Sequence, residues 1–423
     1  MAATGDARPG TGALMERVLS RPNMQRALKR VRRNKGSAGI DGMTVDELPQ
    51  WLKEHWPDVR ERLLSGTYEP SAVRRAVIPK PGGGERELGI PTVLDRLIQQ
   101  ALLQVLQPGF DATFSEHSYG FRPRRGAHGA MREVVRHVEA GKRWVVDVDL
   151  EKFFDRVNHD VLMGRLAKRL GDRRVLLLIR RYLNAGVMAN GVVVERYEGT
   201  PQGGPLSPLL ANVLLDEVDK ELERRGHVFV RYADDLRVFV GSKRAGERVM
   251  RSLVKLFGKL ELKVNESKSA VARAASRPFL SFALWFGPGG KVRLRVAPKA
   301  LHKMKARVRQ LTRRSRGRSL AQVVTSLAAY LNGWRGYFRI ADTGRRFSDL
   351  DQWIRHRLRA YQLKQWKRGT TTFRELRARG LGRLAAAKVA ANTRRWWRNS
   401  GMLIHVAFPI RFFDEMGLPR LAP

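Results

Sequence analysis

The sequence contains no cysteine and no long apolar run. Without cysteine, the chain of 423 residues can form neither disulfide bonds nor thiolate metal sites. No run of about 18 apolar residues is present, so no membrane-spanning helix is predicted. Residues 1–12 lack the basic and apolar regions of a signal peptide. These absences favour a reducing, cytoplasmic location.

Acidic residues are scarce, and positive charge dominates. The chain carries 81 Lys and Arg against 40 Asp and Glu, a formal net charge of +41. Residues 291–423 alone hold 32 basic and 6 acidic residues. This balance predicts a polyanionic partner, and nucleic acid is favoured over a membrane because the basic residues are spread over many segments. We expect the C-terminal part to be mainly a nucleic-acid-binding surface.

Two adjacent carboxylates lie between two short apolar runs. Asp234 and Asp235 are flanked by residues 228–230 and 238–240, whose valines and phenylalanines predict the two strands of a hairpin. A tight turn would hold both carboxylates at the tip of a rigid element. Because adjacent like charges raise each other's pKa, a cation is expected here, and oxygen ligands favour Mg²⁺. A bare acidic pair is more often a solvated turn, so the motif needs support from the rest of the chain.

A third carboxylate is expected from the strand predicted over residues 144–150. Apolar residues occupy one face of this strand, and Asp147 and Asp149 share the other face. Two acids on an otherwise apolar strand are costly unless they bind something. By this argument alone, either acid completes a metal site.

A predicted hairpin carries two cations. Residues 73–79 and 87–90 predict its strands, with Lys80 and Arg86 on opposite arms. Ammonium and guanidinium groups neutralise phosphate oxygens, so this pair suits a nucleoside triphosphate. An ordinary solvated hairpin is the alternative.

Two further loops suit close contact with a ligand. Residues 200–208 place glycines and Gln202 before a helix that Ser207 and Pro208 are expected to open, and glycine lets a backbone approach a ligand closely. Residues 118–126 form a basic and aromatic loop, which we expect to contact a nucleic-acid backbone and stack on bases. The candidate contacts in this loop are Arg122, Arg124 and Arg125.

The C-terminal third predicts basic amphipathic helices. One is expected to begin at Ser319, and a second to begin with Ser348 and Asp351 as a capping pair. The acids that would interleave an ordinary soluble surface are missing. Residues 394–398 combine arginine with tryptophan, which suits phosphate contact and base stacking. The candidate nucleic-acid contacts are Arg335, Arg355, Arg359, Lys364, Arg394, Arg395 and Trp396.

Taken in order, these motifs resemble a reverse transcriptase. Tyr-Ala-Asp-Asp between two strands is similar to the metal-binding signature of that family, and residues 149–154 are similar to its first catalytic motif. The resemblance implies that Asp149, Asp234 and Asp235 bind two Mg²⁺ ions about 4 Å apart.

The resemblance also implies roles for single residues. Phe154 would lie beneath the incoming sugar and reject a 2′-hydroxyl, with the adjacent Phe153 as the alternative. Gln202 would contact nucleotide and template. Lys268 lies in a segment similar to the next family motif, which makes it a candidate general acid near the leaving pyrophosphate, with an ordinary surface lysine as the alternative.

Residues 332–338, followed by a helix containing Trp353, resemble the thumb or maturase domain of group II intron-encoded proteins. The sequence is therefore identified as a member of the group II intron reverse transcriptase/maturase family. This implies an RNA-directed DNA polymerase that uses dNTPs, binds intron RNA and target DNA, and supports mobility by target-primed reverse transcription. With no cysteine and no residue after Pro423, the metal-containing endonuclease of many relatives is expected to be absent.

We expect an α+β chain with a right-hand polymerase fold. The predicted parts are a disordered tail over 1–22, fingers and palm with an antiparallel sheet over 23–290, a helical thumb/maturase domain over 291–370 and a basic C-terminal segment over 371–423. A retron, diversity-generating or defence-associated reverse transcriptase would lack the maturase-like segment, and a non-catalytic RNA chaperone is expected to have lost one of the three acids. The sequence leaves open whether the protein is a monomer or a homodimer.

Overall fold

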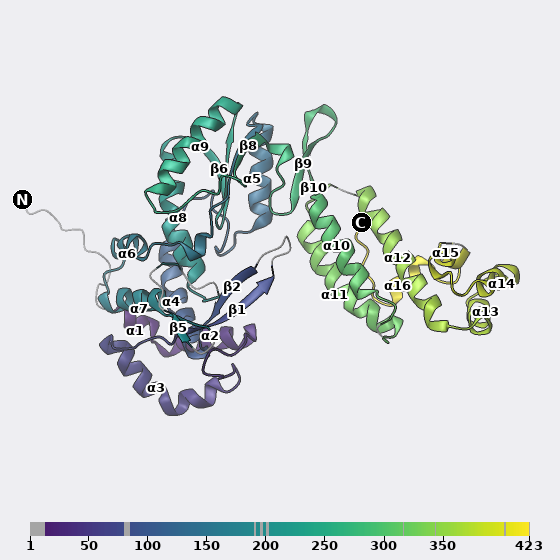
Figure 1. The fold of residues 1–423 in the computed structure, drawn as a ribbon, viewed down its shortest axis with the longest axis horizontal. Coiled ribbons are helices and arrows are strands. Elements are labelled where there is room, and N and C mark those ends of the chain that lie inside the picture. The colour runs from purple at the N-terminus through teal and green to yellow at the C-terminus, as the bar shows by residue number, and fades with distance from the viewer. Residues whose placement is uncertain are drawn as a thin grey trace, which may run out of the picture. The chain divides into compact units, whose positions relative to one another are not determined.

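The computed structural model describes residues 13–79, 85–189, 192–194, 198–199, 203–315, 317–342, 344–401 and 403–422. The chain divides into two compact units, Met1–Ala274 and Ala275–Pro423, and both contain helices and strands (Figure 1). None of the helices in these ranges is long and apolar enough to cross a membrane. The chain is thus a mixed α and β protein with a largely helical C-terminal region.

The first unit alternates helices with short strands. Its helices are α1 (Leu14–Val18), α2 (Arg21–Asn34), α3 (Leu48–Ser65), α4 (Val93–Asp111), α5 (Ala127–Glu139), α6 (His159–Ala167), α7 (Arg173–Asn184), α8 (Ser207–Arg224) and α9 (Lys243–Gly258), with the 3-10 turn η1 (Phe153–Asp155). Its strands are β1 (Val73–Pro79), β2 (Glu85–Ile90), β3 (Trp144–Val148), β4 (Val187–Ala189), β5 (Val192–Val194), β6 (Val228–Tyr232), β7 (Asp235–Val240) and β8 (Ala270–Arg273).

A four-stranded antiparallel sheet with the order β6-β7-β3-β8 positions the candidate site. Because side chains alternate along a strand, the sheet has two faces. One face carries Val146 and Val238, which join the main hydrophobic core together with residues of α8 and α9. The other face carries the facing pair Asp147 and Arg237, and α5 lies on that side, where the rings of His137 and Phe239 are 5.6 Å apart (Figure 1).

A second sheet in this unit has the order β2-β1-β4-β5. Strands β1 and β2 form the predicted antiparallel hairpin, from the pair Arg74–Ile90 to the pair Pro79–Glu85. The parallel pairing of β1 with β4 was not predicted, since the two strands are far apart in the sequence. Lys80 lies outside the described residues.

The second unit begins with a hairpin and continues as helices. Its strands are β9 (Phe282–Phe286) and β10 (Val292–Val296). Its helices are α10 (Pro298–Leu311), α11 (Leu320–Phe338), α12 (Gly344–Trp366), α13 (Gly369–Ala378), α14 (Arg383–Ala391), α15 (Trp396–Ser400) and α16 (Ile410–Glu415), with the 3-10 turns η3 (Pro288–Gly290) and η4 (Leu403–His405), and η2 (Ala274–Ser276) at the boundary between the units.

Several sequence predictions need correction. The predicted disordered tail over 1–22 includes α1, which forms because Met15 and Val18 are buried in the core. A domain boundary between residues 290 and 291 would split the β9–β10 hairpin, whose strands pair from Val292–Phe286 to Val296–Phe282.

The caps of the C-terminal helices were predicted with mixed success. Ser319 and Gln322 form a capping box at the start of α11, as expected for a helix beginning there. The predicted cap of α12 is wrong, because the helix already begins at Gly344. Asp351 lies inside that helix and accepts hydrogen bonds from the backbone N–H groups of Leu421 and Ala422, which ties down the end of the chain.

Candidate active site and nucleic-acid surfaces

The β6–β7 hairpin presents Asp234 and Asp235 at its tip, as the sequence predicted. Tyr232 pairs with Asp235, so Ala233 and Asp234 alone connect the strands. Ala233 has φ +58°, a left-handed conformation that costs an alanine roughly 1 kcal/mol. Gly120 lies against this turn, and a Cβ there would be 2.1 Å from the backbone N of Ala233. The loop that contains Gly120 therefore packs directly against the backbone of this turn.

Strand register brings Asp149 to the same place. Asp147 pairs with Arg237 and Val148 with Leu236, the last pair between β3 and β7, and Asp149 is the next residue after β3. Asp235 is the first residue of β7, and the charge of Asp149 contributes to the raised pKa of Asp235, so the two carboxylates lie near each other. The two acids are thus brought together by the sheet itself.

The segment after α9 fixes the backbone of Asp149. Its N–H donates to Ser269 Oγ at 3.0 Å, and its carbonyl accepts from the N–H of Asn265 at 2.8 Å. The same segment places Lys268 Nζ 3.6 Å from Asp149 Oδ2. Lys268, predicted as a general acid, therefore lies beside a predicted metal ligand.

The electrostatics of the cluster separate Asp147 from the other acids. Asp147 forms an ion pair with Arg237 at 3.2 Å, which explains its place on the strand. Although Asp235 is exposed as a residue, partial loss of hydration and the neighbouring Asp234 raise its pKa to about 6, with smaller contributions from Asp147 and Asp149 and opposition from Arg237. The ionised form of Asp235 is thus disfavoured at the tip.

The carboxylates of Asp149, Asp234 and Asp235 are chemically suited to binding a divalent cation. All three offer oxygen ligands only, which Mg²⁺ prefers, and their mutual repulsion favours a cation among them. Within the described residues, a different group has possible metal-ligand atoms within 4.8 Å of one another. It consists of His117, Glu133 and His137, and it lies between α5 and β6. The three aspartates do not form such a group, and Asp149 is turned towards Lys268.

A buried ion pair anchors the tip, and sequence reasoning missed it. The side chains of Arg231 and Asp219 are 1% and 0% exposed, and their closest nitrogen and oxygen atoms are 2.5 Å apart. Arg231 also donates to Asn212 Oδ1 and to the carbonyl of Ala233, both at 2.9 Å. Asn212 in turn donates to the carbonyl of Gly120 at 3.0 Å. This network, the Arg231 clamp, holds the backbone on both sides of the turn.

The aromatic pair after Asp149 divides into a core residue and an accessible one. Phe153 is 3% exposed and belongs to the main core. Phe154 packs edge-on against it at 5.1 Å and remains partly exposed. Of the two, Phe154 is the ring available to a ligand. The other nucleotide-binding candidates are not described: Lys80 and Gln202 lie outside the described residues, and so does the side chain of Arg86.

The basic loop after α4 differs from its prediction. Arg122 is 8% exposed, and its guanidinium donates to the carboxylate and carbonyl of Asp111 and to the carbonyls of Ser115 and Ser118. The prediction that it contacts nucleic acid is therefore wrong, because it organises the loop instead. Arg124 is exposed, and Arg125 stacks on the Tyr119 ring at 5.6 Å.

In the second unit, basic side chains surround tryptophan rings. Lys305, Arg309 and Arg357 lie 5.5–6.0 Å from the ring of Trp353. Arg314 and the predicted contact Lys364 lie 5.2 and 5.3 Å from the ring of Trp396. Sequence reasoning missed the three cations around Trp353, although their spacing on two amphipathic helices carried the signal.

The remaining predicted contacts divide by exposure. Arg335, Arg394 and Arg395 are exposed, and Arg355 is partly exposed. Arg359 instead donates to the carbonyl of Phe408 at 2.8 Å and lies near the Phe413 ring, so its main contacts are structural.

Known proteins resemble the chain in the same two regions. Residues 78–284 match the family model for reverse transcriptase (RNA-dependent DNA polymerase), and residues 301–380 match that for the group II intron maturase-specific domain. The second match covers the segment that other bacterial reverse transcriptases were expected to lack.

Individual relatives cover part of the chain. Protein YkfC of Escherichia coli (strain K12) is 40% identical over 191 residues, which are 44% of this chain and 50% of that protein. The group II intron-encoded protein LtrA of Lactococcus lactis subsp. cremoris is 38% identical over 206 residues, which are 48% of this chain and 34% of that protein. A solved partial Cas6-RT-Cas1–Cas2 complex aligns at 26% identity with a TM-score of 0.38, over 59% of this chain and 43% of that chain. The matched regions thus span half or less of each relative.

Proposed function

Since the chain belongs to the family of group II intron-encoded reverse transcriptases and maturases, we propose that it is an RNA-directed DNA polymerase that also assists splicing of its intron RNA and supports intron mobility. In this proposal the first unit forms the fingers and palm. The helices of the second unit form the thumb and maturase domain.

The observation that carries the polymerase proposal is the place of Asp234 and Asp235 at the tip of the β6–β7 hairpin, with Asp149 near enough for its charge to act on Asp235. Together they hold two Mg²⁺ ions, and the raised pKa of Asp235 supports this because a divalent cation would relieve the repulsion behind it. Bound Mg²⁺ supplies charge neutralisation at the reacting phosphate and a lower pKa for the primer 3′-hydroxyl. Asp149 directly follows β3 and Asp235 begins β7, so the pairing of these strands and the Arg231 clamp hold both backbones in place before substrate binds.

Other side chains handle the nucleotide. Phe154 lies against the incoming sugar and excludes a 2′-hydroxyl. Lys80 and Arg86 bind the triphosphate, and Gln202 contacts nucleotide and template. Lys268 donates a proton to the leaving pyrophosphate, and its position 3.6 Å from Asp149 supports this role because it keeps the ammonium near the reacting groups.

The maturase role rests on the basic surface of the second unit. Cations around the Trp353 and Trp396 rings offer both phosphate neutralisation and stacking surfaces for intron RNA. The intron RNA performs the cutting and joining, and the protein stabilises its active fold. Target DNA and dNTPs are the further substrates. Since binding releases counterions, RNA affinity should fall steeply with salt.

Primer extension on an RNA template tests the polymerase proposal. Asp234→Asn removes one ligand charge without changing shape, so cDNA synthesis should fall by at least about a hundredfold while RNA affinity stays close to wild type. Asp58→Asn, an exposed acid of α3, is the matched control and should extend normally. Full extension by the Asp234→Asn protein would refute the assignment of the three acids.

A further inference from the structure

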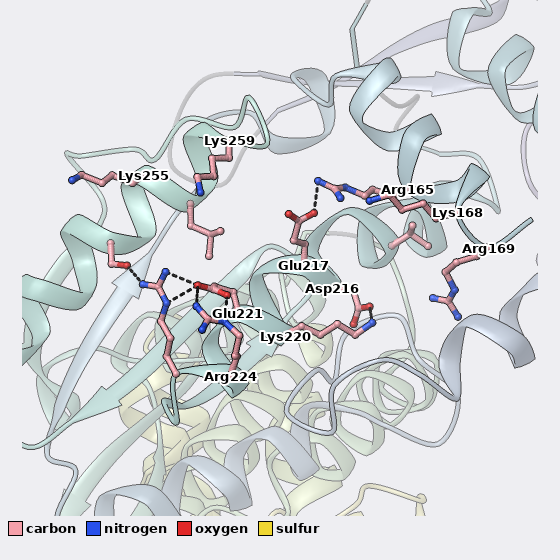
Figure 2. Close-up of a pocket in the computed structure, with 14 residues that line it drawn as sticks. Arg165, Lys168, Arg169, Asp216, Glu217, Lys220, Glu221, Arg224, Lys255 and Lys259 are labelled. Carbon is pink, nitrogen blue, oxygen red and sulfur yellow. Dashed lines mark hydrogen bonds and ion pairs between the residues drawn. The ribbon is translucent and has the colours of Figure 1, made fainter.

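A basic groove lies in the first unit, on the side of the sheet that is covered by α8 and α9. Helices α8 and α9 and the end of α6 form it around a cavity of about 630 Å³ (Figure 2). Eight basic and three acidic side chains line it, an excess of five positive charges. Helices α8 and α9 pack on the sheet face that carries Val146 and Val238, whereas Asp149 and Asp235 belong to the other face. The groove is therefore on the opposite side of the sheet from the proposed active site.

Three carboxylates on α8 hold part of this positive charge. Glu217 pairs with Arg165 across the groove at 2.5 Å. Glu221 pairs with Arg224 and Arg225 at 2.7 and 2.5 Å (Figure 2). These ion pairs fix the acids and arginines within the protein, so they account for the folded shape of the groove rather than for ligand binding.

Three lysines have no such role. Lys168, Lys255 and Lys259 are exposed, and within the described part of the chain none of their ammonium groups has a hydrogen bond or ion pair. Figure 2 shows Lys255 and Lys259 on one side of Glu217 and Lys168 on the other, beside Arg165. Lysines at helix C-termini offset the helix dipole, which accounts for Lys168 and Lys259 at the ends of α6 and α9. The dipole does not explain why lysines from two helices border the same cavity.

A buried acceptor lies among these cations. Asp216 is 6% exposed, and its Oδ2 pairs with Lys220 at 2.5 Å. Its Oδ1 is buried and has no hydrogen-bond partner among the described residues. A buried acceptor without a hydrogen bond is destabilising, so a ligand that donates a hydrogen bond here would be favoured. A phosphodiester group has no such donor, and its negative charge would be repelled by the carboxylate.

We propose that the groove binds a strand of RNA, a choice of partner that rests on the proposed function. The phosphates of the strand contact Lys168 on one side and Lys255 and Lys259 on the other. A ribose 2′-hydroxyl donates to Asp216 Oδ1. RNA combines flanking phosphates with hydroxyl donors between them, which matches cationic borders around a buried acceptor. The site is additional to the basic surface of the second unit.

The test uses the full chain with Lys168, Lys255 and Lys259 all replaced by glutamine. Its matched control replaces Lys29, Lys53 and Lys142, three exposed lysines of the same unit outside the groove, and removes the same charge. Binding of a labelled structured RNA is measured from about 50 to 300 mM salt. The groove variant should bind about tenfold more weakly, with the slope of log affinity against log salt reduced by about 2, and the control should change by less than half as much.

A second variant and two competitors test the identity of the ligand. Asp216→Ala should lower the preference for RNA over single-stranded DNA of the same sequence. Inorganic polyphosphate and that DNA should compete less well than RNA at equal phosphate concentration. Equal competition by either one, or equal loss of RNA binding in the groove and control variants, would overturn the proposal. Primer extension by wild-type protein is a separate readout: its absence would refute the polymerase proposal while the groove result stands.

Discussion

Removing one partner of the Arg231–Asp219 pair tests how the active-site turn is held. Asp219→Asn keeps the shape of the side chain but leaves the Arg231 guanidinium buried without its counter-charge. Arg231 also donates to the carbonyl of Ala233, so the change reaches the backbone of the turn directly. We therefore expect both stability and polymerase activity to fall.

The expected loss of stability follows from burial. With side-chain exposures of 1% and 0%, neither partner is relieved by water when the other is removed. Breaking such a pair costs about 3–5 kcal/mol, because a charge remains buried and unpaired. In a unit of this size, that corresponds to a drop of about 10 °C in the melting temperature. By contrast, Glu415→Gln breaks an exposed pair with Arg411 and should cost no more than about 0.5 kcal/mol.

A double replacement separates stability from positioning. Arg231→Met with Asp219→Leu exchanges the ion pair for apolar side chains, which is often neutral for stability. Most of the lost melting temperature should therefore return. The carbonyl of Ala233 still lacks its donor, so the turn stays misplaced and primer extension should remain about 10- to 100-fold below wild type. Primer extension is measured at about 25 °C, and the melting temperature of each variant is measured separately by a thermal scan.

Two outcomes would refute this reasoning. If the double variant extends primers at the wild-type rate, the Arg231 clamp does not position the turn. If Asp219→Asn melts like Glu415→Gln, burial of the pair does not make it costly to break.

Two further predictions concern the acids and the aromatic pair. Asp235→Asn should stabilise the protein by about 1 kcal/mol near pH 7.5, after allowance for solvent screening, because the raised pKa of Asp235 means that its ionised form destabilises the fold. That cost is present above about pH 6 and is lost as the pH falls towards 4, so melting curves of variant and wild type should converge there, and a constant gap would contradict it. Phe154→Ala should incorporate ribonucleotides more readily in primer extension, since the partly exposed ring is the one available to a sugar. Phe153→Ala should instead lose about 3–5 kcal/mol of stability without relaxed sugar selection, and the reverse pattern would exchange the two roles.

Local pattern was enough to predict the elements that carry the acids. Alternating valines define β3, β6 and β7. The tight turn between β6 and β7 fixes Asp234 and Asp235 at the tip of the hairpin. The strand argument alone left Asp147 and Asp149 equivalent. The pairing register separates them, since Asp147 faces Arg237 whereas Asp149 lies beyond the last pair of β3 with β7, beside Lys268. Register depends on partners far away in the sequence, which periodicity does not reveal.

Charge was a poor guide to exposure. Arg122 lies in a loop of basic and aromatic residues and was predicted to contact nucleic acid, yet it is buried because four loop carbonyl and carboxylate oxygens surround it. Ser207 was predicted to cap α8, but it is the first residue of the helix, and no side chain caps that end. In both cases the prediction relied on residue type, whereas the position of the residue depends on the tertiary structure.

The Arg231 clamp was nevertheless within reach of sequence reasoning. Asp219 occupies the apolar stripe of α8, between Leu215 and Leu222, where the helical period predicts burial. Arg231 directly follows the apolar run 228–230, which the same analysis predicts to be a strand beside the acidic turn. An isolated buried charge costs so much that each of these positions requires a partner of opposite sign. Two such residues, one on each of two consecutive elements, are more economically explained as partners than as two separate exceptions. A charge at a position predicted to be buried is therefore a better sign of a positioning residue than a charge in a basic loop.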